Sequence, residues 1–131
     1  MKLKSNINKV LFLTFSILVL TCMLLYYFVF NIYEVEIVSV PNVVFADPSS
    51  EVIIKIKPIN ALGWEVPLRT TSGTFRITEG KDYVEIIIIN EDEGFMILRA
   101  TGLVGTVGIY VDSKFSLFPS YIKINFLPKS V

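Results

Sequence analysis

Carboxylates, lysines, tyrosines and hydroxyls are the side chains of this 131-residue chain that could do catalytic chemistry, because it has no histidine and a single cysteine, Cys22. The missing histidine excludes Ser-His-Asp and Cys-His catalysis and any histidine-ligated metal. The one acidic cluster, Glu91, Asp92 and Glu93, falls in a turn between two β-rich runs. A wet, convex turn does not separate the pKa values of two carboxylates, as acid–base catalysis requires. We therefore expect no enzyme, no catalytic residue, no cofactor and no metal site.

Composition excludes two further classes of protein. The 12 basic and 12 acidic residues balance, whereas a nucleic-acid-binding protein would carry a basic excess. The hydrophobic fraction of 53% is too high for a disordered chain. With one cysteine no intramolecular disulfide can form, so a folded domain must be stable through its core alone.

Residues 10–30 form an apolar run without a single charge. As a helix this run would be about 31 Å long, which matches the hydrocarbon core of a bilayer, about 30 Å thick. Backbone groups in lipid must satisfy their own hydrogen bonds, so such a run is helical. The sequence predicts a transmembrane helix over residues 10–30.

The flanks of this run indicate its orientation. Lys2, Lys4 and Lys9 precede it, whereas Glu34 and Glu36 follow it. By the positive-inside rule, residues 1–9 are cytoplasmic and residues 31–131 form an extracytoplasmic domain. The expected location is the cell membrane, with one pass.

Four residues are expected at the membrane–water interfaces: Lys9 on the inner side, and Tyr26, Tyr27 and Tyr33 on the outer side, where amphipathic rings are favoured. A cleaved signal peptide is the alternative. Its apolar region would span about 7–15 residues and end in small residues, and this run fits neither requirement. We expect an uncleaved signal anchor.

The exported segment reads as a series of short strands separated by turn signals. Seven or eight strands at this spacing predict an all-β fold, an antiparallel β-sandwich. The expected strands cover residues 35–40, 51–57, 64–71, 74–78, 83–90, 95–100, 106–112 and 121–126.

Alternation along these strands divides their residues between the core and the outer faces. The predicted core contains Val52, Ile54, Ile86, Ile88, Ile109 and Ile124. The predicted outward residues include four large apolar ones, Ile53, Ile87, Ile89 and Tyr110, with Phe95 and Ile97 as further candidates. Apolar outward faces mark partner surfaces, unless a bulge shifts the register and turns such residues inward. Trp64 is expected as a lid on the core, with a sugar-stacking platform as the alternative.

Three segments of the exported part resemble motifs of bacterial Ig-like domains of the invasin/intimin type. Residues 60–67 (N-A-L-G-W-E-V-P) are similar to their D-x-N-G-x-P-V-P connection, and residues 90–94 (N-E-D-E-G) to their T-D-x-x-G turn. Residues 105–111 (G-T-V-G-I-Y-V) are similar to their G-T-A-x-I-x-A strand. The resemblance covers about residues 35–126 and implies an Ig-like sandwich. Family members usually occur as tandem arrays on large surface proteins, whereas this chain has one copy on a short anchor.

Two classes of function follow for a membrane-anchored module of this kind. The first is non-enzymatic protein–protein contact, in adhesion or envelope assembly, through an outward face containing Ile87, Ile89 and Tyr110. The second is an extracytoplasmic binding subunit for a glycan or small molecule, accessory to another protein. The expected partners are the lipid bilayer and an envelope or cell-surface protein, with a glycan as the alternative and no nucleic acid.

Overall fold

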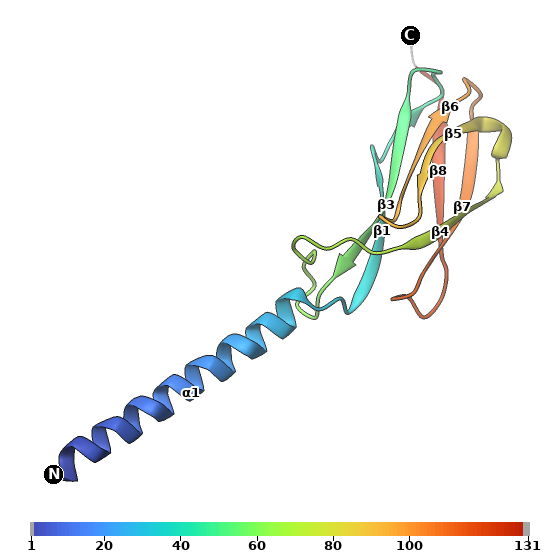
Figure 1. The fold of residues 1–131 in the computed structure, drawn as a ribbon. Helices are drawn as coiled ribbons and strands as arrows, with labels where there is room; N and C mark the ends of the chain where they lie inside the picture. Colours follow the sequence, from blue (N-terminus) through green and yellow to red (C-terminus); the bar gives the residue numbers. More distant parts are fainter. Residues whose placement is uncertain (1, 130–131) are drawn as a thin grey trace.

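The N-terminal helix α1 (Lys2–Phe30) projects away from the rest of the chain in a computed structural model that describes residues 2–129 (Figure 1). It ends at Phe30, where the apolar run ends, and begins well before residue 10. Within it, residues 6–30 are long and apolar enough to cross a membrane, and this stretch is unburied by the rest of the chain. The hydroxyls of Thr14 and Thr21 donate to the carbonyl oxygens one turn earlier, so these two polar side chains are satisfied inside the helix.

The remaining chain folds into two four-stranded sheets packed face to face. Their strands are β1 (Glu34–Val40), β2 (Val44–Phe45), β3 (Glu51–Ile59), β4 (Gly73–Glu79), β5 (Val84–Asn90), β6 (Phe95–Ala100), β7 (Gly105–Ser113) and β8 (Ser120–Leu127). A short 3₁₀ turn, η1 (Lys81–Tyr83), precedes β5. The predicted β-sandwich behind an N-terminal apolar helix is confirmed.

The order of the strands is that of an immunoglobulin-type sandwich. The first sheet runs β1-β3-β6-β5, which matches strands A-B-E-D of that fold, and β8-β7-β4 of the second sheet match G-F-C. The two-residue strand β2, which the sequence did not predict, adds to the second sheet and pairs with β8 in parallel. The second sheet is therefore mixed rather than purely antiparallel.

The core lies between the sheets and is formed by alternate residues of the central strands. Val52, Ile54, Ile109 and Ile124 are buried in it, as predicted. Ile86 and Ile88 are not: they are 43% and 46% exposed, so the prediction that they belong to the core is wrong.

A β-bulge in β5 and the position of this strand at the edge of the sheet explain the two errors. Ile86 pairs with Leu98 and Ile88 pairs with Ile97, so Ile87 is an extra residue that reverses the alternation. Ile88 therefore turns to the outer face. Ile86 stays on the inner side, but β5 is an edge strand, and its inner side is only partly covered.

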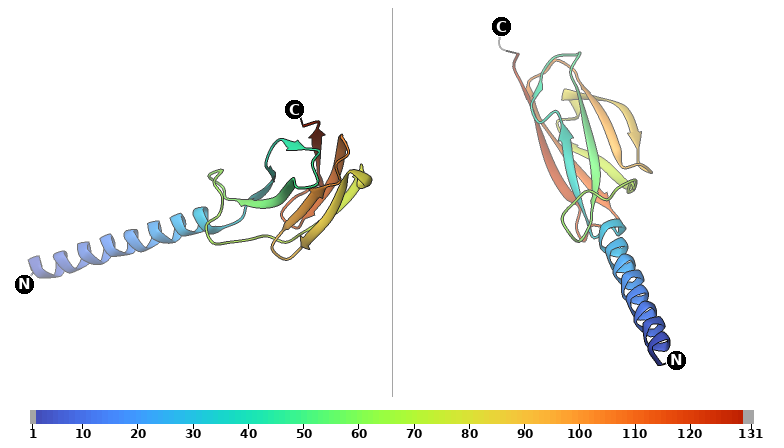
Figure 2. Two further views of the ribbon diagram at one scale, coloured as in Figure 1. Left: turned by 90° about the horizontal axis from the view of Figure 1, so that it is seen from above. Right: turned by 90° about the vertical axis from the view of Figure 1, so that its left-hand side faces the viewer.

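The predicted strand over residues 64–71 is also wrong. These residues belong to the long β3–β4 loop (residues 60–72), in which only Glu65 forms an isolated bridge, to Ile59. The loop lies beside the end of α1 in Figure 1 and in both views of Figure 2.

Candidate interaction surfaces

The outer face of the first sheet carries a row of apolar side chains that crosses all four strands. Val40 pairs with Ile53, Ile53 with Ile97, and Ile97 with Ile88. Directly paired residues share a face of the sheet, so the four side chains lie side by side. We call them the outer apolar row. Val40 is 59% exposed and Ile53 is 42% exposed, whereas Ile97 is half-buried.

Local sequence explains why this row faces outward. Ile53 stands between two buried residues of β3, Val52 and Ile54, and Ile97 stands between Met96 and Leu98 of β6. Successive residues of a strand point to opposite faces, so both isoleucines must point away from the core. A solvated sheet face normally carries polar residues at such positions.

Ion pairs flank the outer apolar row along the same face. Arg99 Nη2 lies 2.7 Å from Glu51 Oε1, across β6 and β3. Glu65 of the β3–β4 loop lies 3.6 Å from Lys55 and 3.5 Å from Lys57. An apolar strip bordered by charged side chains has the composition of an interaction surface with a polar rim.

The structure separates the four residues that the sequence assigned to an interface. Ile53 belongs to the outer apolar row. Ile89 pairs with the buried Met96 and thus lies on the inner side of edge strand β5, and Ile87 is the half-buried extra residue of the bulge. Tyr110 is on β7, in the other sheet. The expectation that Ile87, Ile89 and Tyr110 share one face is therefore wrong.

Two residues of the outer apolar row, Val40 and Ile88, were missed at the sequence level. Val40 follows from the alternation of β1, which places it on the same face as Glu36. Ile88 could not be found in this way, because four consecutive isoleucines show no alternation.

Tyr110 belongs to a second surface, on the outer face of the sheet that contains β7. Its ring lies 4.8 Å from the ring of Tyr121 on β8, and Lys123 lies 5.7 Å from the Tyr121 ring. Burial, together with a hydrogen bond to the Glu79 carboxylate, raises the pKa of Tyr121. A shallow groove of about 390 Å³ opens beside Tyr110, and its other lining residues are Thr74, Arg76, Thr78, Asp112 and Pro119.

The acidic cluster Glu91, Asp92 and Glu93 lies in the exposed turn between β5 and β6. The side chain of Asn90 accepts a hydrogen bond from the Glu93 backbone N–H at 3.1 Å, and Gly94 ends the turn with a φ of 66°. Across residues 2–129, no three His, Cys, Asp or Glu side chains come close enough together to hold a metal ion.

The residues expected at the outer membrane interface gather where α1 meets the sandwich. Tyr26 and Tyr27 are on the last turns of α1, and Tyr33 is exposed just before β1. Lys9 is exposed near the other end of α1. The membrane contacts of these four residues remain predictions.

Trp64 is not the lid of the core. Its side chain is 64% exposed on the β3–β4 loop. Val66, two residues later in the same loop, is buried. The loop is joined to α1 by two hydrogen bonds, from Asn60 Nδ2 to the Val29 carbonyl oxygen at 3.0 Å and from Arg69 Nη1 to the Phe30 carbonyl oxygen at 2.9 Å.

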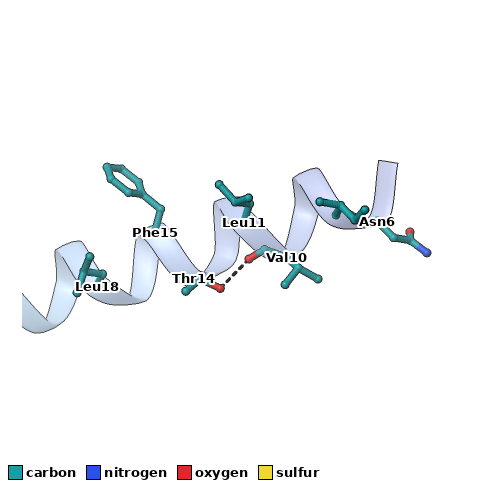
Figure 3. Close-up of a pocket in the computed structure, with 7 residues that line it drawn as sticks. Asn6, Val10, Leu11, Thr14, Phe15 and Leu18 are labelled. Carbon is teal, nitrogen blue, oxygen red and sulfur yellow. Dashed lines mark hydrogen bonds between the residues drawn. The ribbon is translucent and has the colours of Figure 1, made fainter. Parts of the chain in front are cut away.

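The hollows along α1 are those of a lone helix surface. Figure 3 shows one of them around Thr14, where the labelled residues all project from the same helix and the dashed line marks the hydrogen bond from Thr14 to Val10. No second element among residues 2–129 encloses this surface, so it is the exposed side of a single helix and not an enclosed pocket.

No protein-family model and no curated protein matches the chain. Among solved structures, a glycosyl hydrolase family 2 member from Bacteroides cellulosilyticus has a TM-score of 0.54 and 16% identity, over 73% of this chain and 14% of that chain. A second family 2 member, from Bacteroides cellulosilyticus DSM 14838, has a TM-score of 0.53 and 16% identity, over 72% of this chain and 15% of that chain. The Yersinia pseudotuberculosis adhesin InvE has a TM-score of 0.44 and 18% identity, over 72% of this chain and 26% of that chain.

The two hydrolase structures support the fold of the sandwich and nothing finer, because their identity to this chain is 16%. The chain spans 14% and 15% of their lengths, so the likeness concerns one module of much larger proteins. A shared fold does not fix a shared function.

Proposed function

We propose that this chain is a membrane-anchored, non-enzymatic Ig-like module that works by protein–protein contact in adhesion or envelope assembly. The observation that carries the proposal is the outer apolar row, which crosses the whole first sheet at the surface. Its central position between charged side chains suits a partner that excludes water from the isoleucines. The three motifs that resemble invasin/intimin-type domains support the same class of function.

The proposed anchor is α1, with its N-terminus in the cytoplasm and the sandwich outside. Its apolar stretch, residues 6–30, supports this role by length and composition. Lys2 and Lys4 before the stretch and Glu34 after it support the orientation. An anchor also raises the effective concentration of a partner in the same membrane, so a modest contact surface suffices for binding.

Protease accessibility tests the topology. Protease added outside intact cells or spheroplasts should remove a tag placed after residue 131 and spare a tag placed before residue 1. Protection of the C-terminal tag would overturn the proposed orientation. A mature N-terminus sequenced beyond Tyr33 would overturn the uncleaved anchor.

Site-specific photo-crosslinking tests the contact surface. A photoreactive amino acid at Ile53 or Ile88 should form one discrete crosslinked product in cells, whereas the same amino acid at Thr74, on the outer face of the other sheet, should not. The double variant Ile53→Lys/Ile88→Lys should abolish that product when the photoreactive group stands at Val40, with the thermal midpoint nearly unchanged. A folded double variant that keeps the product would show that the contact lies elsewhere.

The groove beside Tyr110 supports a second candidate function, binding of a glycan or small molecule. It combines an aromatic ring with Arg76 and Asp112, which could hydrogen-bond hydroxyl groups. Under this alternative, Tyr110→Ala should abolish binding on a glycan array and leave the Ile53 crosslink intact. The two candidates are thus separable, because their surfaces lie on opposite sheets.

A further inference from the structure

The β3–β4 loop is held against the last turn of α1. Its hydrogen bonds reach the carbonyl oxygens of Val29 and Phe30, which are unsatisfied groups of a helix C-terminus. Arg69, which makes one of these bonds, also places a cation where the helix dipole is negative. A groove of about 380 Å³ separates the loop from the helix, and its lining residues are Tyr26, Tyr27, Phe30, Asn31, Pro67, Leu68 and Arg69. The loop is therefore positioned relative to the helix end.

This loop turns its large apolar side chains outward. Leu62 and Trp64 are exposed, and Leu68 is fully exposed. Leu68 is also the one non-glycine residue among residues 2–129 with positive φ, at 56°. This backbone conformation is strained for a leucine, so the surrounding loop must impose it.

Glu65 and Val66 attach the same loop to the sandwich. Glu65 pairs with Lys55 and Lys57 of β3, and the Val66 backbone N–H donates to the Pro58 carbonyl oxygen at 2.8 Å. Glu65 is paired with the sheet and Val66 is buried, whereas the apolar side chains of Leu62, Trp64 and Leu68, which we call the tip of the loop, are each exposed.

The end of α1 sets the depth of this tip. If residues 6–30 span the bilayer, the carbonyls of Val29 and Phe30 lie at its outer boundary. The interfacial layer on each side of the hydrocarbon core is about 5–7 Å thick, and tryptophan is enriched in it. A loop bonded to those two carbonyls lies within reach of that layer.

We infer that the β3–β4 loop is a second membrane contact, whose tip of Leu62, Trp64 and Leu68 docks into the outer headgroup–acyl boundary and fixes the orientation of the sandwich on the bilayer. The inference rests on the proposed anchoring of α1. The partner of the tip is the lipid surface, because the loop is hydrogen-bonded to the helix end that meets that surface. The sandwich is joined to α1 by the chain between Phe30 and β1 and by the two hydrogen bonds of this loop, and a lipid contact would add a further restraint on its orientation.

Trp64 is the one tryptophan of the chain and reports directly on this contact. The full chain is reconstituted into phosphatidylcholine vesicles, with or without bromine on the acyl chains close to the headgroup. Trp64 should lose most of its emission in the brominated vesicles and be shielded from aqueous acrylamide. Emission that acrylamide quenches and the brominated lipid does not would overturn the inference.

The variant Trp64→Phe/Leu103→Trp is the matched control. Leu103 is an exposed apolar residue of the β6–β7 loop. This loop lies at the end of the sandwich away from α1 (Figure 1). The emission of this variant's tryptophan should be quenched by acrylamide and not by the brominated lipid. Equal bromine quenching of the parent and this control would mean that the signal is unspecific, and the inference would be wrong.

A second variant tests whether the loop's own apolar side chains hold it at the boundary. Leu68→Asp adds a charge at the tip, and aspartate tolerates positive φ, so the fold should be kept. This variant should lose much of the bromine quenching of Trp64 and still float with the vesicles. Unchanged quenching would overturn the inference and leave the anchor standing. A parent chain that fails to float would overturn the anchor and the inference together.

Discussion

Asn60 Nδ2 donates to the carbonyl oxygen of Val29 at 3.0 Å, so one buried side chain joins the turn after β3 to the end of α1. The same side chain accepts hydrogen bonds from the backbone N–H groups of Leu62 and Trp64, both at 3.0 Å. Asn60 is 2% exposed. A buried polar group without partners is destabilising, so the three hydrogen bonds of Asn60 stabilise the fold. They shape the turn after β3 and connect this turn to the end of α1.

Replacing Asn60 should therefore destabilise the chain. Asn60→Ala leaves the carbonyl of Val29 and two backbone N–H groups without their partner, and we expect a loss of about 3 kcal/mol. Thermal unfolding of the full chain in detergent micelles, followed by near-ultraviolet circular dichroism, measures it. Asn60→Asp keeps the acceptor for Leu62 and Trp64 but loses the donor to the helix. An Asn60→Asp variant as stable as the parent would show that the bond to Val29 contributes nothing.

Asn90 provides the matched control for this substitution. Its side chain accepts one hydrogen bond, from the Glu93 N–H, in an exposed turn. Asn90→Ala should cost no more than about 1 kcal/mol, because water replaces the lost partner.

The sequence predicts the inner and outer faces of some strands and not of others, depending on whether apolar and polar residues alternate along the strand. In β3, buried Val52, Ile54 and Ile56 alternate with exposed or half-buried residues, so periodicity alone gave the strand, its inner face and the outward Ile53. In β5, residues 86–89 are all isoleucine, and their phase is set by the bulge against β6. A bulge depends on pairing between distant strands, which no local pattern contains.

The prediction of a strand over residues 64–71 was wrong for a related reason. Residues 64–71 contain β-branched and aromatic residues typical of a strand, but Asn60 bonds to the N–H of Leu62 and Trp64 and starts a turn. The contacts of the loop with Val29 and Phe30 join residues 31 and 39 positions apart. The position of the loop at the helix end was therefore not visible in the sequence. Strand β2 was missed because it has two residues and pairs with the last strand.

Core and surface isoleucines should differ sharply in their effect on stability. Ile54 is fully buried, so Ile54→Ala should reduce the free energy of unfolding by about 2–5 kcal/mol. Ile88→Ala, at a 46% exposed position of the outer apolar row, should cost less than about 1 kcal/mol. Chemical unfolding of both variants measures the difference. A large loss for Ile88→Ala would mean that Ile88 packs in the core and would remove it from the proposed contact surface.

Two turn glycines with positive φ differ in the space around them. Replacing each by alanine separates the cost of backbone strain from the cost of a steric collision. Gly63 has a φ of 79°, and a Cβ added there meets nothing within 4 Å. Gly94 has a φ of 66°, and a Cβ added there would collide with the carbonyl oxygen of Thr71. Gly63→Ala should thus cost only the backbone strain, about 1–2 kcal/mol. Gly94→Ala should cost clearly more, because the added Cβ would meet a backbone oxygen and not the movable end of a flexible side chain.

Unfolding of the two alanine variants under identical conditions checks this order. Equal losses at the two positions would mean that the Thr71 segment moves freely, and that the β3–β4 loop is less firmly held than its hydrogen bonds indicate.

The last prediction concerns acid stability at the end of the sandwich away from α1. Asp47 accepts hydrogen bonds from Lys129 Nζ at 2.8 Å, and from the N–H and hydroxyl of Ser49 at 3.0 and 2.9 Å. The bond from Lys129, followed by those from Ser49, lowers the pKa of Asp47 from 3.8 to about 2. A carboxyl whose pKa is lower in the folded state stabilises the fold above its unfolded pKa. That contribution is lost as the pH falls through the folded value.

The thermal midpoint of the parent chain should therefore decline between pH 3.8 and about 2, and Asp47→Asn should make this decline shallower. The substitution should also lower the midpoint at pH 5, because it removes the charge partner of Lys129 next to the β2–β8 pair. Asp92→Asn, in the exposed turn after β5, is the matched control and should leave the midpoint at pH 5 unchanged. If Asp47→Asn and the parent lose stability along the same slope, Lys129 does not hold this carboxylate in solution. The end of the chain would then be held at β2 by the pairing of β2 with β8 and by the hydrogen bond from the Ala46 N–H to the Leu127 carbonyl oxygen.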